Sequence, residues 1–197
     1  MDFKKRIKGV ITQSLVQAIL NDVKYRVMPL GIEEVIRELN TLSVDEYHQM
    51  SLPQSLRKLP DFFVTTADQK VGWLLEVKYR KCWDDSVKND LGLILQEQVK
   101  LWSPLHMVLF VGEPARQNDT PASFIGTCKL VIEEGRLGIL KKVNGGFSKD
   151  KMEFIPWSRV YWSHFNRFQD TFPGVTDSWE QETLIKTVRM MKSLYDL

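Results

Sequence analysis

Two carboxylates and one lysine stand at or inside two hydrophobic segments of this sequence. Asp61 follows Pro60 at the start of one segment, and Glu76 and Lys78 lie two positions apart in the next, Val71 to Arg80. Alternation along a β-strand puts Glu76 and Lys78 on the same face, with their Cβ atoms roughly 6 to 7 Å apart. An acid and an amine at that spacing can both act on one bound cation and its water.

Phosphodiester hydrolysis needs such a set of groups. A hard cation held by carboxylates neutralises the developing charge, and a deprotonated water attacks phosphorus. Asp61 and Glu76 are therefore candidate Mg²⁺ ligands, with the backbone carbonyl of Val77 as a natural additional ligand. Lys78 is the candidate to orient or help deprotonate the water and to offset negative charge in the transition state.

The two segments are predicted to form a hairpin. Phe62 to Thr66 and Val71 to Arg80 are rich in β-forming residues, and the polar connection Ala67 to Lys70 has hairpin length. The strands should therefore pair antiparallel. That pairing would bring the Asp61 carboxylate alongside Glu76.

The residues before Asp61 predict two helices and a strand. Apolar residues recur at three- and four-residue steps from Ile7 to Asn21, which is typical of an amphipathic helix. Tyr25 to Leu30 is short and apolar and predicts a strand, and Gly31 opens a second helix that runs to about Leu39. Residues 40–59 are interrupted by prolines and predict an insertion made of loop and helix.

A long helix and a buried strand are predicted after the hairpin. Asp84, Asp85 and Ser86 are good N-caps, and the apolar residues from Val87 to Trp102 mark a helix that Pro104 stops. Met107 to Val111 is continuously apolar, as in a strand that helices cover on both faces. The order is thus helix, strand, strand, strand, helix, strand.

The rest of the chain predicts short strands and a final helix. Residues 123–155 alternate strand-like runs with turn signals, and 178–194 has helical spacing of apolar residues. The predicted fold class is α/β, with a mixed central β-sheet flanked by helices. Residues 1–112 would form the core, with the insertion at about 40–59. Residues 113–197 would form a C-terminal elaboration that packs on this core and is not an independent domain.

Composition is that of one globular domain inside the cell. The chain has 197 residues, of which 43% are hydrophobic and 26% charged. It shows no apolar run of membrane-spanning length, and its basic start is not followed by the apolar stretch of a secretion signal. We therefore expect a cytoplasmic protein. The net charge of +2 is too small to indicate nucleic acid by itself.

The spacing of the candidate residues closely resembles a known signature. Pro60-Asp61, then fourteen residues, then Glu76-Val77-Lys78 is similar to the motif of the PD-(D/E)xK nuclease superfamily, which includes restriction endonucleases and archaeal Holliday-junction resolvases. The predicted element order also matches the core of that superfamily, over roughly residues 7–112. The resemblance implies a restriction-endonuclease-like core and dependence on Mg²⁺ or Mn²⁺.

Two further features of the superfamily have partial counterparts here. Many members add a glutamate from the first helix, but this helix has none; Gln13 and Gln17 are its nearest polar residues. Glu34, on the next predicted helix, is the candidate for this metal ligand. Some members carry a glutamine followed four residues later by an aromatic residue, which Gln98 and Trp102 resemble. Gln98 would then point back towards the metal site as an additional catalytic residue.

Each of these patterns also has a simpler interpretation. An aspartate and a Glu-x-Lys on adjacent strands can be a solvated sheet face with a cross-strand ion pair. Basic residues near the start of the chain and at the end of the catalytic strand are candidate nucleic-acid contacts: Lys4, Lys5, Arg6 and Arg80. For those at the start, a solvated helix face is at least as good an explanation.

An aromatic and basic cluster follows residue 156. It comprises Trp157, Arg159, Tyr161, Trp162, His164, Phe165, Arg167 and Phe168. Such residues can stack bases and hold phosphates. The four-residue spacing of Trp157, Tyr161 and Phe165 favours instead a second packed core.

The sequence thus predicts a metal-dependent nuclease that cleaves phosphodiester bonds in nucleic acid, with DNA the expected substrate. Cutting a duplex would usually need a homodimer or a partner subunit, since one core contacts one strand. The alternative is a nuclease-fold module that has lost catalysis and serves in nucleic-acid binding or protein interaction.

Overall fold

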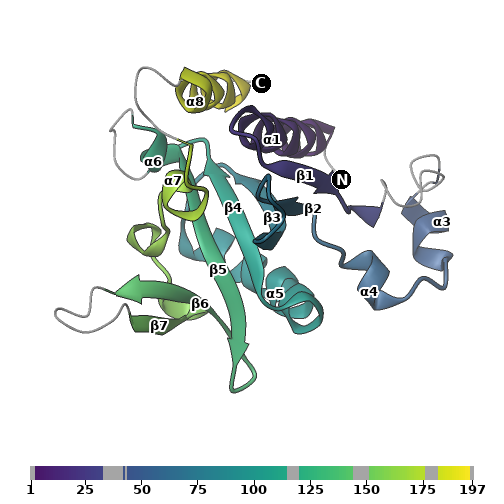
Figure 1. Cartoon of the computed structure of the whole chain (residues 1–197). Helices are drawn as coiled ribbons and strands as arrows, with labels where there is room; N and C mark the ends of the chain where they lie inside the picture. Colours follow the sequence, from purple (N-terminus) through teal and green to yellow (C-terminus); the bar gives the residue numbers. More distant parts are fainter. Residues whose placement is uncertain are drawn as a thin grey trace.

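One seven-stranded sheet organises the protein, with strand order β1-β2-β3-β4-β5-β6-β7. The computed structural model describes residues 3–32, 42, 44–114, 120–143, 151–175 and 182–195. Helices lie on both faces of the sheet (Figure 1). Only the β3–β4 pair is parallel among the neighbours in this sheet, and the other pairs are antiparallel. The predicted α/β class with a mixed central sheet is confirmed.

The N-terminal elements follow the prediction closely. The first helix, α1, spans Phe3–Asp22, and the first strand, β1, spans Arg26–Pro29. The second predicted helix falls mostly on residues 33–41, which lie outside the described ranges. The insertion holds two short helices, α3 (Val44–Gln49) and α4 (Gln54–Arg57).

The hairpin and the crossover that follows it are also confirmed. Strands β2 (Phe62–Thr65) and β3 (Gly72–Arg80) pair antiparallel, with Phe62 opposite Leu75. Helix α5 spans Asp85–Trp102 and leads into β4 (Leu105–Val111), which runs parallel to β3. The Asp84 side chain accepts a hydrogen bond from the backbone N–H of Val87 and caps the helix.

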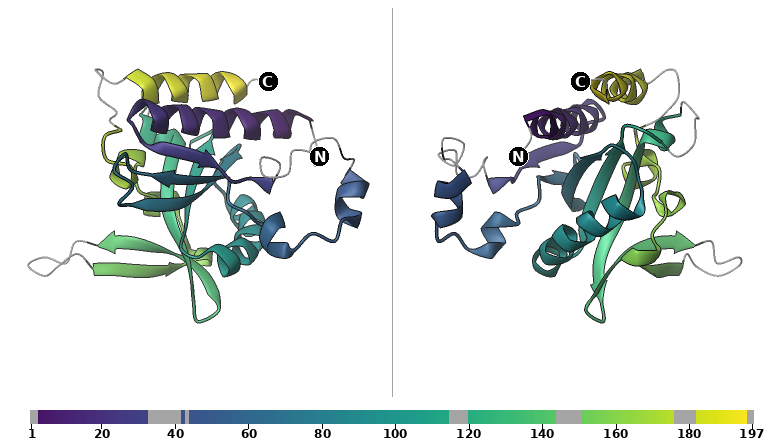
Figure 2. Two further views of the ribbon diagram at one scale, coloured as in Figure 1. Left: turned by 45° about the vertical axis from the view of Figure 1, so that its right-hand side comes forward. Right: turned by 180° about the vertical axis from the view of Figure 1, so that it is seen from behind.

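The C-terminal strands continue this same sheet. Strands β5 (Ile125–Glu133), β6 (Arg136–Val143) and β7 (Lys151–Pro156) follow β4 in antiparallel order. Glu134 and Gly135, between β5 and β6, have φ of 50° and 75°, as a tight two-residue hairpin turn requires. The β6–β7 ribbon projects away from the helices at one end of the sheet (Figure 2).

Short helical segments and one long helix complete the described chain. The short ones are α6 (Pro121–Phe124), the 3₁₀ helices η2 (Trp157–Arg159) and η3 (Trp162–His164), and α7 (Phe168–Thr171). The predicted last helix is confirmed as α8, Glu182–Tyr195, and it lies beside α1 (Figure 2). No helix in the described ranges combines the length and the apolarity that a membrane span requires.

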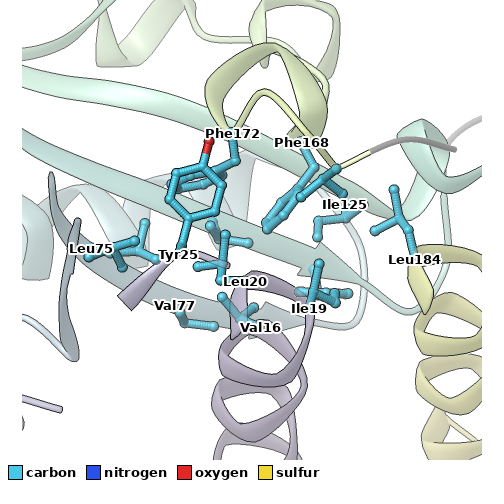
Figure 3. Packing of buried hydrophobic residues seen from close by; sticks show 14 of the residues in the cluster. Val16, Ile19, Leu20, Tyr25, Leu75, Val77, Ile125, Phe168, Phe172 and Leu184 are labelled. Atoms are coloured by element: carbon cyan, nitrogen blue, oxygen red, sulfur yellow. The ribbon is translucent and has the colours of Figure 1, made fainter. Parts of the chain in front are cut away.

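Two hydrophobic clusters, one on each face of the sheet, hold the layers together. On one face, α1 packs over β3 and β4, and Figure 3 shows Val16 and Leu20 beside Val77 and Leu75, with Ile19 towards Ile125. On the other face, α5 contributes a buried stripe over β4, β5 and β6: Leu91, Leu95 and Val99. Because both faces of β4 are covered, its continuously apolar sequence is explained.

Alternation along β3 decides which side chains meet which helix. Leu75 and Val77 belong to the cluster under α1, whereas Leu74 packs with the cluster under α5. Glu76 and Lys78 share the face of Leu74 because side chains two apart in a strand point the same way. Glu76 and Lys78 therefore lie on the α5 side of the sheet.

Gly92 allows α5 to approach the segment after β7, and we expect Gly92→Ala to destabilise the fold. A Cβ at this position would lie 2.8 Å from both Cδ1 and Nε1 of Trp157, whose indole donates a 2.8 Å hydrogen bond to the carbonyl of Lys88. Forcing the indole away should cost about 1 to 3 kcal/mol of unfolding free energy. Urea unfolding followed by tryptophan fluorescence measures this.

Gly9 provides the matched control for that substitution. It also lies in a helix, and a Cβ added there would meet nothing within 4 Å. Gly9→Ala should therefore stabilise the protein by up to about 1 kcal/mol through helix propensity. Equal effects of the two substitutions would contradict the close packing at Trp157.

Candidate active site

The Asp61 carboxylate is fixed to the backbone of β3. Its Oδ2 accepts a 2.7 Å hydrogen bond from the N–H of Val77. Strand β2 begins at Phe62, so no residue of β2 pairs with the N–H of Val77. The Asp61 carboxylate accepts this hydrogen bond in place of a backbone carbonyl of β2. Extending the β2–β3 register by one residue sets Asp61 opposite Glu76. The backbones of the two acids are thus neighbours across the hairpin, and a shared metal between their carboxylates stays a prediction.

Gln13 reaches the same carboxylate from α1. Its Nε2 donates a 2.8 Å hydrogen bond to Asp61 Oδ1. Both carboxylate oxygens of Asp61 are therefore held, one by β3 and one by α1. A carboxylate fixed by two donors keeps one orientation.

Glu76 is buried and held from two sides. Its side chain is 5% exposed; Oε1 accepts from Nζ of Lys78, and Oε2 accepts a 2.7 Å hydrogen bond from Nε2 of Gln98. Gln98 lies on the buried face of α5, where Leu91 and Leu95 also lie. The expectation that Gln98 points back towards the two acids holds in the structure.

Lys78 keeps its proton at neutral pH. Burial lowers the pKa of its ammonium, but the charges of Glu76 and Asp61 and the hydrogen bond to Glu76 raise it by more, so the net direction is upward. The Lys78 side chain is 23% exposed, so its amine sits between the buried acid and solvent. In this arrangement the group is a fixed positive charge rather than a base.

Two acceptor oxygens remain beside the acids. Within the described part of the chain, Gln98 Oε1 is buried and meets no hydrogen-bond donor, while Gln98 Nε2 is also 3.5 Å from the carbonyl of Leu59. The carbonyl of Val77 points to the same side of β3 as its N–H, towards Asp61, because both groups of one strand residue face the same neighbour. A buried acceptor without a donor is a place where an ordered water fits.

This set of oxygens fits Mg²⁺ or Mn²⁺. The described residues include no group of three or more His, Cys, Asp or Glu that could hold a metal ion. Mg²⁺ commonly keeps several waters and is bound through one or two carboxylates plus substrate phosphates. Asp61, Glu76 and the Val77 carbonyl are donors of that kind, and Gln98 Oε1 offers an acceptor for a bound water.

The remaining predicted residues lie in different places. Glu34 lies outside the described residues, so its role as a ligand stays a prediction. Lys4, Lys5 and Arg6 lie in the first turns of α1. Arg80 ends β3 on the face of Glu76, and its Nη1 donates a 2.7 Å hydrogen bond to the carbonyl of Tyr79. Burial lowers the pKa of Arg80, and the charge of Asp90 opposes this.

The aromatic and basic cluster divides into an inner and an outer part. Trp157 and Phe168 are buried, and Trp162 and Phe165 pack against the cluster under α5, as a second core requires. Tyr161, by contrast, is 63% exposed. The prediction of a second core is confirmed for Trp157 and Phe165. It is wrong for Tyr161, which belongs to the outer part, because this segment forms two short 3₁₀ helices in place of one helix with four-residue spacing.

Gln13 is the residue whose place in the site was not predicted. It is one of the nearest polar residues of the first helix, whereas the residue predicted as the additional ligand is Glu34. A sequence signal did exist, because Gln13 precedes Val16 and Leu20 by three and seven residues, and both face the sheet. A polar residue on the buried stripe of a helix needs a partner, and Asp61 provides it.

Comparison with protein-family models, with curated proteins and with solved structures gave no match for this chain. A functional assignment therefore depends on these residues and their arrangement.

Proposed function

We propose that this chain is a divalent-metal-dependent nuclease of the PD-(D/E)xK superfamily that hydrolyses phosphodiester bonds in DNA. The observation that carries the proposal is the convergence of Asp61, Glu76 and Lys78 at the junction of β2 and β3. A solvated ion pair on a sheet face would leave the acid exposed, whereas only 5% of the Glu76 side chain is exposed. A buried acid with ordered polar partners is typical of a functional site.

Each residue then has a defined part in the reaction. Asp61, Glu76 and the Val77 carbonyl would hold Mg²⁺ or Mn²⁺, which supplies positive charge at the scissile phosphate and acidifies water. Gln13 and Gln98 orient the two carboxylates through the hydrogen bonds described above. Lys78, protonated at neutral pH, offsets negative charge as the phosphorus centre is attacked.

Duplex cleavage would need a second copy or a partner subunit, because one such site acts on one strand. The rival is a nuclease-fold module without catalysis that binds nucleic acid or protein. One observation favours this non-catalytic module: Gln13 places an amide on the first helix, where many members of the superfamily have a carboxylate.

Metal binding and cleavage separate these alternatives. Mn²⁺ at ten times its dissociation constant should stabilise the protein by about 1.4 kcal/mol, which raises the melting temperature by a few degrees. Asp61→Asn, which keeps the side-chain shape, should lose this shift. Asp68→Asn is the matched control, because Asp68 is an exposed carboxylate in the β2–β3 turn. Wild-type protein should cleave labelled linear, branched or single-stranded DNA only when Mg²⁺ or Mn²⁺ is present.

The two readouts have separate meanings. A metal shift without cleavage of any DNA or RNA would favour the non-catalytic module. An equal shift in Asp61→Asn and wild type would place the metal elsewhere and overturn the proposed site.

A further inference from the structure

An open groove lies where the β6–β7 ribbon meets the segment that follows it. Six residues line this groove, which has a volume of about 530 Å³: Lys141, Glu153, Ile155, Arg159, Tyr161 and His164. Lys141 and Glu153 are paired across β6 and β7, so their side chains share one face of the ribbon. The groove is thus built from a rigid sheet face and from the outer part of the aromatic and basic cluster.

Tyr161 presents an exposed aromatic ring from a fixed backbone. Its side chain is among the exposed large hydrophobic ones, yet its backbone N–H donates a 3.1 Å hydrogen bond to Nδ1 of His164. The ring lies 5.7 Å from the His164 ring and 5.7 Å from Nζ of Lys88. Lys88 itself is buried and pairs with Asp85 at 2.7 Å. An exposed ring held in one place is a suitable surface for stacking.

Positive charge borders this ring. Lys141 is anchored by a 2.7 Å hydrogen bond from Nζ to the carbonyl of Ser163, and Arg159 is exposed on η2. Burial and the charge of Lys141 lower the pKa of His164, while Glu153 and the backbone of Arg159 act in the opposite direction. His164 is therefore a neutral ring at physiological pH, and Lys141 and Arg159 are the cations of the groove.

The groove and the candidate active site lie along the same helix. Gln98 of α5 contacts Glu76, whereas Lys88 of α5 contacts Tyr161. Ten residues of helix separate them, which corresponds to about 15 Å along the axis. Sites for single strands span about 4 to 16 nucleotides, so one strand is long enough to reach both.

We propose that this groove binds an unpaired segment of nucleic acid, with a base stacked on Tyr161 and the backbone phosphates beside Arg159 and Lys141. The proposal rests on the proposed function, because it extends the same substrate beyond the cleavage site. An unpaired strand fits better than a duplex, since stacking on a side chain needs a base that is free of its own helix. The substrate would then be DNA with a single-stranded region, such as a branch, a flap or a free end.

Binding of a fluorescent twelve-nucleotide strand in EDTA tests the groove independently of catalysis. Tyr161→Ala should weaken binding by about tenfold or more, since stacking of one base is worth about 1 to 3 kcal/mol. Tyr161→Phe should bind like the wild type. Arg159→Gln should flatten the dependence of log affinity on log salt by about 0.7, the value for one lost phosphate contact on a single strand. Quenching of a 2-aminopurine base in the strand should require Tyr161 or its phenylalanine replacement.

Lys142→Ala is the matched control, because Lys142 is exposed on the opposite face of β6 from Lys141. The proposal is overturned if Tyr161→Ala binds as tightly as Lys142→Ala, or if the wild type binds a fully paired duplex better than the single strand. If the wild type cleaves DNA and Tyr161→Ala binds the strand as tightly as the wild type, the nuclease proposal is kept and the groove proposal is rejected. If Tyr161→Ala loses strand binding and the wild type cleaves no DNA, the groove proposal is kept and the nuclease proposal is rejected.

Discussion

Replacing Lys78 with methionine should lower the rate of metal-dependent DNA cleavage by about a thousandfold. Electrostatic stabilisation of a transition state by one positioned group is worth about 10² to 10³ in rate, and we expect the upper end for a full positive charge. The Lys78 ammonium donates a hydrogen bond to Glu76, and the charge of Asp61 also raises its pKa. It is therefore positioned at the place where phosphate oxygens would approach the two acids. Single-turnover cleavage of a labelled DNA measures the effect without contributions from product release.

Two variants separate the chemistry of Lys78 from its effect on folding. Lys78→Arg keeps the positive charge and an ion pair with Glu76, yet the guanidinium differs in shape and hydrogen-bond geometry from the compact ammonium. It should fold like the wild type and still lose most of the activity. Lys142→Met removes an exposed lysine from the β6–β7 ribbon and should cleave normally. Cleavage by Lys78→Met within tenfold of the wild-type rate would remove Lys78 from the mechanism.

The site was predictable from sequence where it depends on strand geometry. The period of two along β3 placed Glu76 and Lys78 together, and the short polar connection after β2 set the antiparallel pairing. Both features are local, so the residue types and their spacing are enough to predict them. Gln98 was also predictable, because helical spacing fixed its face relative to Leu91 and Leu95.

Long-range contacts were less predictable, and Gln13 illustrates the reason. Its partner is 48 positions away, and the contact depends on how α1 is rotated and placed over the sheet. Sequence periodicity identifies the buried stripe of a helix but not the strand that the stripe meets. The hydrogen bond from Val77 to Asp61 is equally hard to predict, since it depends on β2 beginning one residue after Asp61.

The C-terminal strands show a similar limit. Turn signals at Glu134-Gly135 marked where one strand ends and the next begins, and the structure confirms a hairpin there. No local signal indicated that β5 would pair with β4 and extend the central sheet. The partner of a strand is decided by which sheet edge is available, and that is a property of the whole fold.

The Glu76–Lys78 pair should be strongly coupled in stability when no metal is added. Glu76→Gln leaves the Lys78 ammonium without its carboxylate, and Lys78→Met leaves a buried carboxylate without its cation. Breaking a buried ion pair by removing one partner typically costs about 3 to 5 kcal/mol. Since Lys78 is 23% exposed, we expect the lower end, about 3 kcal/mol for either variant. For a chain of this size that is a fall of about 6 to 12 °C in melting temperature.

The double variant Glu76→Gln with Lys78→Met should lose much less than the sum of the two single effects, because neither charge is left alone. Since folding raises the pKa of Lys78, the stabilisation is fully present below the unfolded value of 10.5 and is lost as pH rises through the folded pKa. Urea unfolding in EDTA at pH 7.5 therefore measures the whole coupling. Additive single effects would show that the pair is solvated and contributes little.

Metal should change this result in a specific way if the two acids form a cation site. In Lys78→Met the carboxyl groups of Asp61 and Glu76 remain while the nearby ammonium is gone. Mn²⁺ should then stabilise this variant more than it stabilises the wild type, because the bound cation replaces the missing positive charge. Glu76→Gln should show a smaller Mn²⁺ shift than the wild type, since one ligand has lost its charge. A Mn²⁺ shift that is the same in all three proteins would mean that the cation binds away from Glu76.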